Sequence, residues 1–265
     1  MKFLIRALHA ELLKTKRTLA FWLALIAPAV VVAVQVAVIW DRQSYYFQNP
    51  EIIQQTWYEY GKETAVLWGL LMLPLFVTLE TALVAQWEHK SGQWKHLFAL
   101  PIPRWALYAA KQVSGMGLIG LSIAALFGLL VLSGWGFRLL SPGLGFEAPV
   151  PWLEYGKYGL TMFLGAWLIV AIQTWVAQRW SSFAVASGVG IALTVAGVVV
   201  VQSEWANFYP YILPVIVGNG FVDEAMRALN GFTEGLPWVE LLAGSVGGIA
   251  VAVAGGWQVT RRDVL

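Results

Sequence analysis

The chain has 265 residues and a net charge of +2, but only 12% of its residues are charged and 58% are hydrophobic. Soluble domains average about 25% charged residues, so this composition leaves too little polar surface for a water-soluble fold. The lack of cysteine excludes disulfides and thiolate chemistry. We therefore expect one integral membrane domain over residues 1–265.

The first 17 residues form a basic, amphipathic stretch. Phe3, Leu4, Leu8 and Leu12 share one helical face, and the basic residues lie largely off it. Such a helix is expected to lie in the membrane interface. The apolar run that follows is too long for the core of a signal peptide, so we expect it to be a retained first span.

Six apolar stretches are long enough to cross a bilayer, which takes roughly 20 helical residues. They are 18–40, 64–87, 112–137, 158–178, 180–203 and 241–260. Backbone groups in hydrocarbon must be hydrogen-bonded within their own segment, so these stretches are expected to be helices. The predicted fold is an all-α membrane protein with both termini on one side.

The charges predict which side that is. With the N-terminus inside, 12 of the 17 lysines and arginines lie on the cytoplasmic side, together with 3 of the 15 acids. Eleven acids and five basic residues then lie outside, and one acid lies within a span. Positive residues favour the cytoplasmic side, which predicts cytoplasmic termini and a place in the cytoplasmic membrane.

Two regions depart from simple spans and short loops. Residues 204–240 are expected to form a long extracytoplasmic loop with a short helix at Asp223–Leu229. In the second span, Pro74 is expected to kink the helix, because proline removes a backbone hydrogen bond.

The cytoplasmic connection at 88–104 is the most informative segment. Trp87, Trp94 and Phe98 recur on one helical face, and polar and basic residues fill the other. Pro101 and the proline two residues further on end the pattern. We expect a short amphipathic helix that lies across the cytoplasmic ends of two spans.

A family pattern runs through this segment: a glutamate at the end of the second span, a glycine, a Leu-Pro pair, an arginine, and a lysine that opens the third span. Here these residues are Glu88, Gly92, Leu100-Pro101, Arg104 and Lys111. The pattern resembles the cytoplasmic coupling region of permease subunits in the type-2 ABC exporter superfamily. The run from Gly92 to Leu97 is similar to the subgroup that contains bacitracin and lantibiotic self-protection permeases, although Gln93 stands where much of the superfamily has threonine.

The resemblance implies a transport subunit that is not itself an enzyme. Two permeases, identical or related, would each seat the cytoplasmic helix on an ATP-binding cassette subunit. That subunit would hold ATP and Mg, and this chain would bind no cofactor. The ATPase-coupling residues would be Glu88, Gly92, Trp94, Pro101, Arg104 and Lys111. The substrate would be an amphipathic drug, peptide antibiotic or lipid, and no nucleic acid is involved.

Other interpretations stay open at this stage. Segment 88–104 could be an ordinary basic inner loop, since such loops are general in membrane proteins. The chain contains no G-x-x-x-x-G-K-[ST] motif, so the transporter hypothesis needs a separate ATPase. An intramembrane enzyme would need paired ionisable residues inside spans. A scaffold or ion-coupled transporter would need several buried ionisable residues or paired broken helices.

Glu80 in the second span is the intramembrane polar candidate. It could pair with a polar group in the bundle, bind a cationic substrate or reach the cytoplasmic headgroups.

Small residues that recur every four positions form a ridge on each of two spans, and each ridge could serve packing within the chain or a dimer interface. They are Gly120, Ala124 and Gly128 in the third span, and Gly244, Gly248, Ala252 and Gly256 in the sixth. The three histidines lack the clustering of a metal site, so no metal is expected.

Overall fold

A computed structural model describes residues 2–16, 18–49, 53–90, 103–203, 205–222 and 236–261, and all regular structure in these ranges is helical. Six helical stretches among them are long and apolar enough to cross a membrane: Leu19–Asp41, Thr56–Gln86, Arg104–Leu140, Trp152–Arg179, Phe183–Val200 and Trp238–Thr260. The prediction of an all-α, six-span membrane protein is confirmed for this part of the chain.

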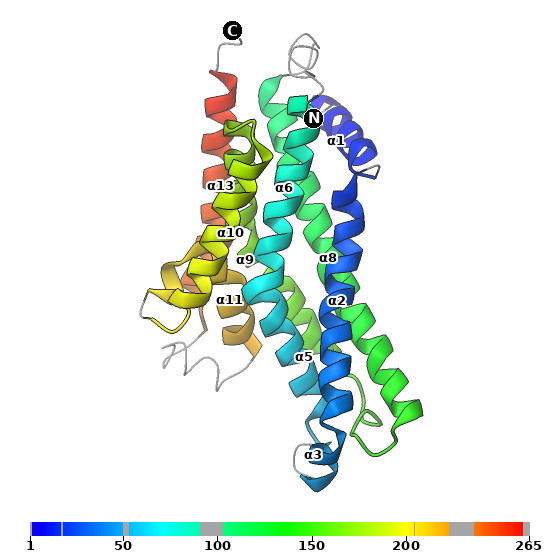
Figure 1. The fold of residues 1–265 in the computed structure, drawn as a ribbon. Helices are drawn as coiled ribbons and strands as arrows, with labels where there is room; N and C mark the ends of the chain where they lie inside the picture. Colours follow the sequence, from blue (N-terminus) through cyan, green and yellow to red (C-terminus); the bar gives the residue numbers. More distant parts are fainter. Residues whose placement is uncertain are drawn as a thin grey trace.

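The elements follow one another in a simple up-and-down course (Figure 1). The long helices are α1 (Lys2–Thr15), α2 (Leu19–Asp41), α5 (Thr56–Leu67), α6 (Leu73–Lys90), α8 (Arg104–Leu140), α9 (Trp152–Arg179), α10 (Phe183–Val200), α11 (Leu213–Val222) and α13 (Trp238–Thr260). Short helices α3 (Gln43–Gln48), Ala206–Phe208 and Pro210–Ile212 lie in the connections.

Helix α1 and the last turn of α13 lie at the same end of the bundle (Figure 1). We call this the terminal end. The opposite end, with α3 and the connection 141–151, is the far end. An even number of crossings requires this arrangement, so the placement of the termini on one side follows from the span count.

Helix α1 packs against α8 rather than lying free in the interface. Ala7 is buried with Leu107 and Ala110 of α8, and Leu4 and Leu8 pack at the edge of this cluster. The other two residues of the predicted apolar face, Phe3 and Leu12, are exposed. The buried stripe is therefore rotated from the predicted face, and it includes Glu11.

The second span carries a backbone irregularity at its proline. A π-helical turn, Trp68–Met72, joins α5 to α6 just before Pro74. Proline cannot donate a backbone hydrogen bond to the preceding turn, and π-turns are one way in which a helix absorbs the resulting mismatch. The irregularity lies where the sequence predicted a kink.

The third span is longer than its apolar core. Hydropathy predicted 112–137, whereas α8 contains 37 residues, from Arg104 to Leu140. At 1.5 Å per residue it is about 55 Å long, against about 30 Å for the hydrocarbon layer. Helix α8 begins at Arg104, the last residue of the predicted coupling segment, and continues without a break to Leu140.

Residues 205–222 are not an extended outer loop. The apolar stretch Pro210–Val222 is helical, too short to span, and packed on α9. Every residue from 213 to 220 is buried. The predicted helix at Asp223–Leu229 lies outside the described residues.

The two small-residue ridges have different surroundings. On α13, a Cβ at Gly244 or Gly248 would lie within 2.8 Å of the α9 backbone, so this part of the ridge serves packing within the chain. On α8, Gly128 has no neighbouring atom within 4 Å of its Cβ position, and Gly120 meets only the ring of Phe163. The α8 ridge therefore stays available as an interface.

Candidate functional site

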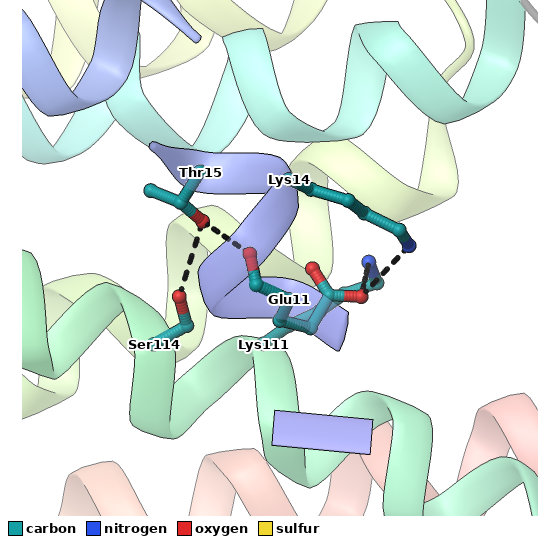
Figure 2. Close-up of polar contacts among 5 residues, drawn as sticks. All are labelled: Glu11, Lys14, Thr15, Lys111 and Ser114. Carbon is teal, nitrogen blue, oxygen red and sulfur yellow. Dashed lines mark hydrogen bonds and ion pairs between the residues drawn. The ribbon is translucent and has the colours of Figure 1, made fainter. Parts of the chain in front are cut away.

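A buried ion pair joins α1 to α8 at the terminal end (Figure 2). Nζ of Lys111 lies 3.1 Å from Oε1 of Glu11, and Nζ of Lys14 lies at the same distance from that oxygen. The side chain of Glu11 is 2% exposed and that of Lys111 is 7% exposed. A charge removed from water in this way is stable only when paired, so the two helices are held in one register.

Local helix geometry brings these groups together. Glu11 and Thr15 are four residues apart on α1, and Lys111 and Ser114 are three apart on α8, so each pair lies on one helix face. Oγ1 of Thr15 lies 3.4 Å from Oγ of Ser114 and donates to the carbonyl of Glu11 at 2.7 Å (Figure 2). The contact thus has an apolar part around Ala7 and a polar part around Glu11.

The electrostatics favour an ionised Glu11. Burial raises the pKa of this carboxyl, but the positive charges and hydrogen bonds of Lys111 and Lys14 outweigh burial and place the pKa below its ordinary value. The ion pair is therefore formed at neutral pH.

Glu80 of α6 lies in the same region. It is 2% exposed, which excludes the alternative that it reaches the headgroups, and its Oε2 has no hydrogen-bond partner among the described residues. A Cβ at Gly115 of α8 would lie only 3.3 Å from its Oε1, so glycine leaves room for the carboxyl.

A cavity of about 20 Å³, enough for one water molecule, joins Glu80 to the ion pair. Its polar lining comes from four helices and consists of Glu11, Glu80, Thr81, Lys111, Ser114, Thr174 and Gln178. The terminal end therefore holds a connected set of buried polar groups that includes the ion pair.

The predicted coupling residues fall into two groups. Arg104 is the first residue of α8, and Lys111 lies two turns further on in the ion pair. Glu88 lies in the last turn of α6, but its side chain is not described. Gly92, Trp94 and Pro101 lie outside the described residues. Because α6 ends and α8 begins at the terminal end, segment 91–102 connects two helix ends there (Figure 1).

The sequence reasoning did not pair Glu11 with Lys111. A signal was present, since Glu11 is one of three acids on the strongly basic side of the predicted topology. Its partner is 100 residues away, however, and helical spacing relates only residues on the same helix.

Within the described residues no group of three or more His, Asp or Glu side chains could hold a metal ion.

Residues 7–197 match the model of the family described as ABC-2 family transporter protein. No curated protein matches the chain. The matched segment contains most of α1, the first four spans and most of the fifth, and therefore both partners of the buried ion pair.

Proposed function

This chain belongs to the ABC-2 transporter family, and we propose that it moves an amphipathic substrate by using the motion of a separate ATP-binding cassette subunit docked on segment 88–104. As a member it is a multi-pass membrane permease, a transport subunit. To this family assignment the proposal adds two things: the site where the ATPase subunit docks and the class of substrate. The family match over most of the chain is the observation that carries it.

The geometry supports a mechanical role for the terminal end. A subunit that pulls on segment 88–104 acts on the end of α6 and the start of α8 together. Because Glu11 and Lys111 join α1 to α8, α1 moves with α8 as one body. The unbroken length of α8 carries this displacement to the far end, as expected for rigid elements in domain motions.

The distribution of charge supports a cytoplasmic terminal end. Described basic residues there include Lys14, Arg104, Lys111, Arg179 and Arg261, whereas described acids at the far end include Asp41, Glu59, Glu63, Glu147 and Glu154. The excess of positive charge at one end follows the positive-inside rule, so the docking site faces the compartment that contains ATP.

The remaining parts of the proposal follow from the family pattern. The ATPase subunit binds ATP and Mg, and a second permease, identical or related, completes the pathway. The substrates are drugs, peptide antibiotics or lipids, exported or extracted from the membrane, so the complex would confer antibiotic resistance. Intramembrane catalysis and ion coupling are not favoured, because Glu80 is the one ionisable acid within the predicted spans.

The test is purification of the tagged chain from its own host, followed by assay of substrate-stimulated ATP hydrolysis. We expect a P-loop ATPase to co-purify. In that complex, Glu88→Gln and Arg104→Gln should each lower the stimulation about tenfold, which is within the range typical of coupling between two sites. The matched control is Arg138→Gln, which removes a positive charge from the far end of α8.

The outcomes separate the parts of the proposal. A chain that transports without any ATPase would overturn the proposed mechanism as a whole. An ATPase that co-purifies, with stimulation unchanged in both coupling variants, would place the docking site elsewhere.

A further inference from the structure

A large groove lies between α8 and α13 near the terminal end, with Trp167 of α9 also contributing. Its volume is about 460 Å³ and its lining is mostly apolar. We call it the terminal groove. From α8 it is lined by Trp105, Tyr108 and Gln112, and from α13 by Ala252, Gly256 and Trp257.

Small side chains on α13 keep the terminal groove open. Ala252 and Gly256 are four residues apart and face α8, where larger residues would fill the space. The ring of Tyr108 forms part of the wall and is 3% exposed, 3.4 Å from the Cβ position of Gly256. The Tyr108 hydroxyl accepts a hydrogen bond of 3.3 Å from Nε2 of Gln112. The α8 wall is thus packed around this hydrogen bond, while Oε1 of Gln112 and Nε1 of Trp167 have no hydrogen-bond partner among the described residues.

The groove opens on the surface that faces the membrane. Val113 of α8 and Ile249 and Val253 of α13 line it and are all more than 40% exposed. Inside a bilayer, the exposed apolar mouth of a space of this size is in contact with hydrocarbon. The nearest source of hydrocarbon is a phospholipid acyl chain.

The end of the groove carries features of the headgroup layer. Trp105 and Trp257 flank it on opposite helices and are about half exposed, at 49% and 58%. Indoles favour the level of the headgroups. Cζ of Arg261 lies 3.9 Å from the ring centroid of Trp257, which holds a guanidinium beside the mouth of the groove. A guanidinium at this level attracts phosphate.

We propose that the terminal groove binds one anionic glycerophospholipid, with an acyl chain between α8 and α13 and the phosphate on Arg261. A second copy of the chain is the competing occupant. It is disfavoured because the cores of protein interfaces are depleted of charge, and because two exposed indoles and a guanidinium mark a membrane–water boundary. The proposed orientation of the chain would place this lipid in the cytoplasmic leaflet. Lipid binding itself does not depend on that orientation.

Native mass spectrometry of the purified chain tests this site. Equal amounts of phosphatidylglycerol and phosphatidylcholine are added in detergent, and bound lipid is counted by mass. We expect one retained phosphatidylglycerol, preferred about fivefold, which is what one basic residue near a membrane surface contributes. The ATPase subunit is absent, so failure here is distinct from failure of the proposed transport function.

Three variants sharpen the test. Ala252→Phe should fill the groove and abolish retention of both lipids, whereas Val246→Phe, on the exposed lipid-facing side of the same helix, should retain them. Arg261→Gln should remove the preference for phosphatidylglycerol and leave chain binding intact. Because Arg261 is an exposed residue at the end of α13, Arg261→Gln is expected to fold, and it tests the phosphate contact even if Ala252→Phe fails to fold.

Two results would overturn the proposal. One is equal lipid retention in the wild type and Ala252→Phe. The other is loss of a dimer in Ala252→Phe with lipid binding unchanged, which would make the groove a contact between two copies of the chain.

Discussion

The two ends of the bundle are held together by different chemistry. At the terminal end, α1 is joined to α8 by the charged pair Glu11–Lys111, which two further hydrogen-bonding side chains support. At the far end, the buried contacts between helices are mainly aromatic, and the charged contacts of Glu59 and Glu147 lie nearer the surface. The docking of α1 at the terminal end therefore depends on the ionisation of a buried group, whereas the aromatic cluster does not.

The far end is closed by the connection 141–151, which folds inward. Phe146 is 1% exposed, and its ring centroid lies 4.9 Å from that of Trp57 and 5.4 Å from that of Phe137. The hydroxyl of Tyr155 donates to the carbonyl of Trp57 at 2.6 Å. Gly145 has φ +89°, and a Cβ there would meet the carbonyl of Ile53, so glycine is required at this turn.

This difference indicates that the two ends respond differently when a movement is imposed on the bundle. Aromatic contacts of this kind are short-ranged and tightly packed, so they hold the far end in one arrangement. At the terminal end, α1 is docked on α8 by the ion pair and by the apolar contacts of Ala7, beside a small polar cavity. Movement imposed there is therefore expected to carry α1 and α8 as one body, while the aromatic cluster at the far end stays together as one packed unit.

The largest effect on stability is expected at the far end. Phe146→Ala removes the ring around which Trp57 and Phe137 pack, and should lower the free energy of unfolding by about 4 kcal/mol, as for other buried phenylalanines. Thermal unfolding in detergent measures it. Phe47→Ala, at an exposed phenylalanine of the same end, is the control and should change little. Equal loss in the two variants would show that the aromatic cluster is not what holds the far end together.

A smaller and more local effect is expected at the terminal end. Glu11→Ala leaves Lys111 buried without its carboxylate, which should cost about 3 kcal/mol. The loss should appear as release of α1, and the far end should stay folded. Because the chain has no cysteine, spin labels at Ala10 and Trp105 can report the distance between α1 and α8.

The paired replacement is the control for this variant. Glu11→Gln combined with Lys111→Met removes both charges, and should restore α1 docking because no unpaired charge is left buried. An unchanged distance in Glu11→Ala would contradict the role of the ion pair.

The smallest effect is the pH dependence of the same contact. The pKa of Glu11 is lower in the folded protein than its ordinary value of 4.5. The stabilisation is therefore complete well above pH 4.5 and is lost as the pH falls through the lower, folded-state pKa. The same spin-label distance, followed from pH 7 downwards, should lengthen only in the acidic range. In the Glu11→Gln variant this dependence should be absent.

Much of the fold could be predicted because it depends on local properties. A run of about 20 apolar residues must cross the hydrocarbon as a helix, whatever its neighbours are. The helix ends were less accurate, since α8 continues for eight residues before its predicted start and for three beyond its predicted end. Hydropathy marks where lipid begins, and a helix does not have to stop there. Residues 213–222 were missed as a helix because a mostly apolar stretch of ten residues is too short for a span.

The amino-acid sequence alone determined the membrane environment, the six crossings, the common side of the termini and the family pattern around segment 88–104, because each depends on residues close together in the chain. Tertiary structure decided which buried charges meet and which small residues stay uncovered. Glu11 finds Lys111 only because α1 folds back on α8, and the terminal groove exists only because Ala252 and Gly256 face α8. Contacts between distant segments depend on the packing of whole helices, which spacing along one helix does not contain.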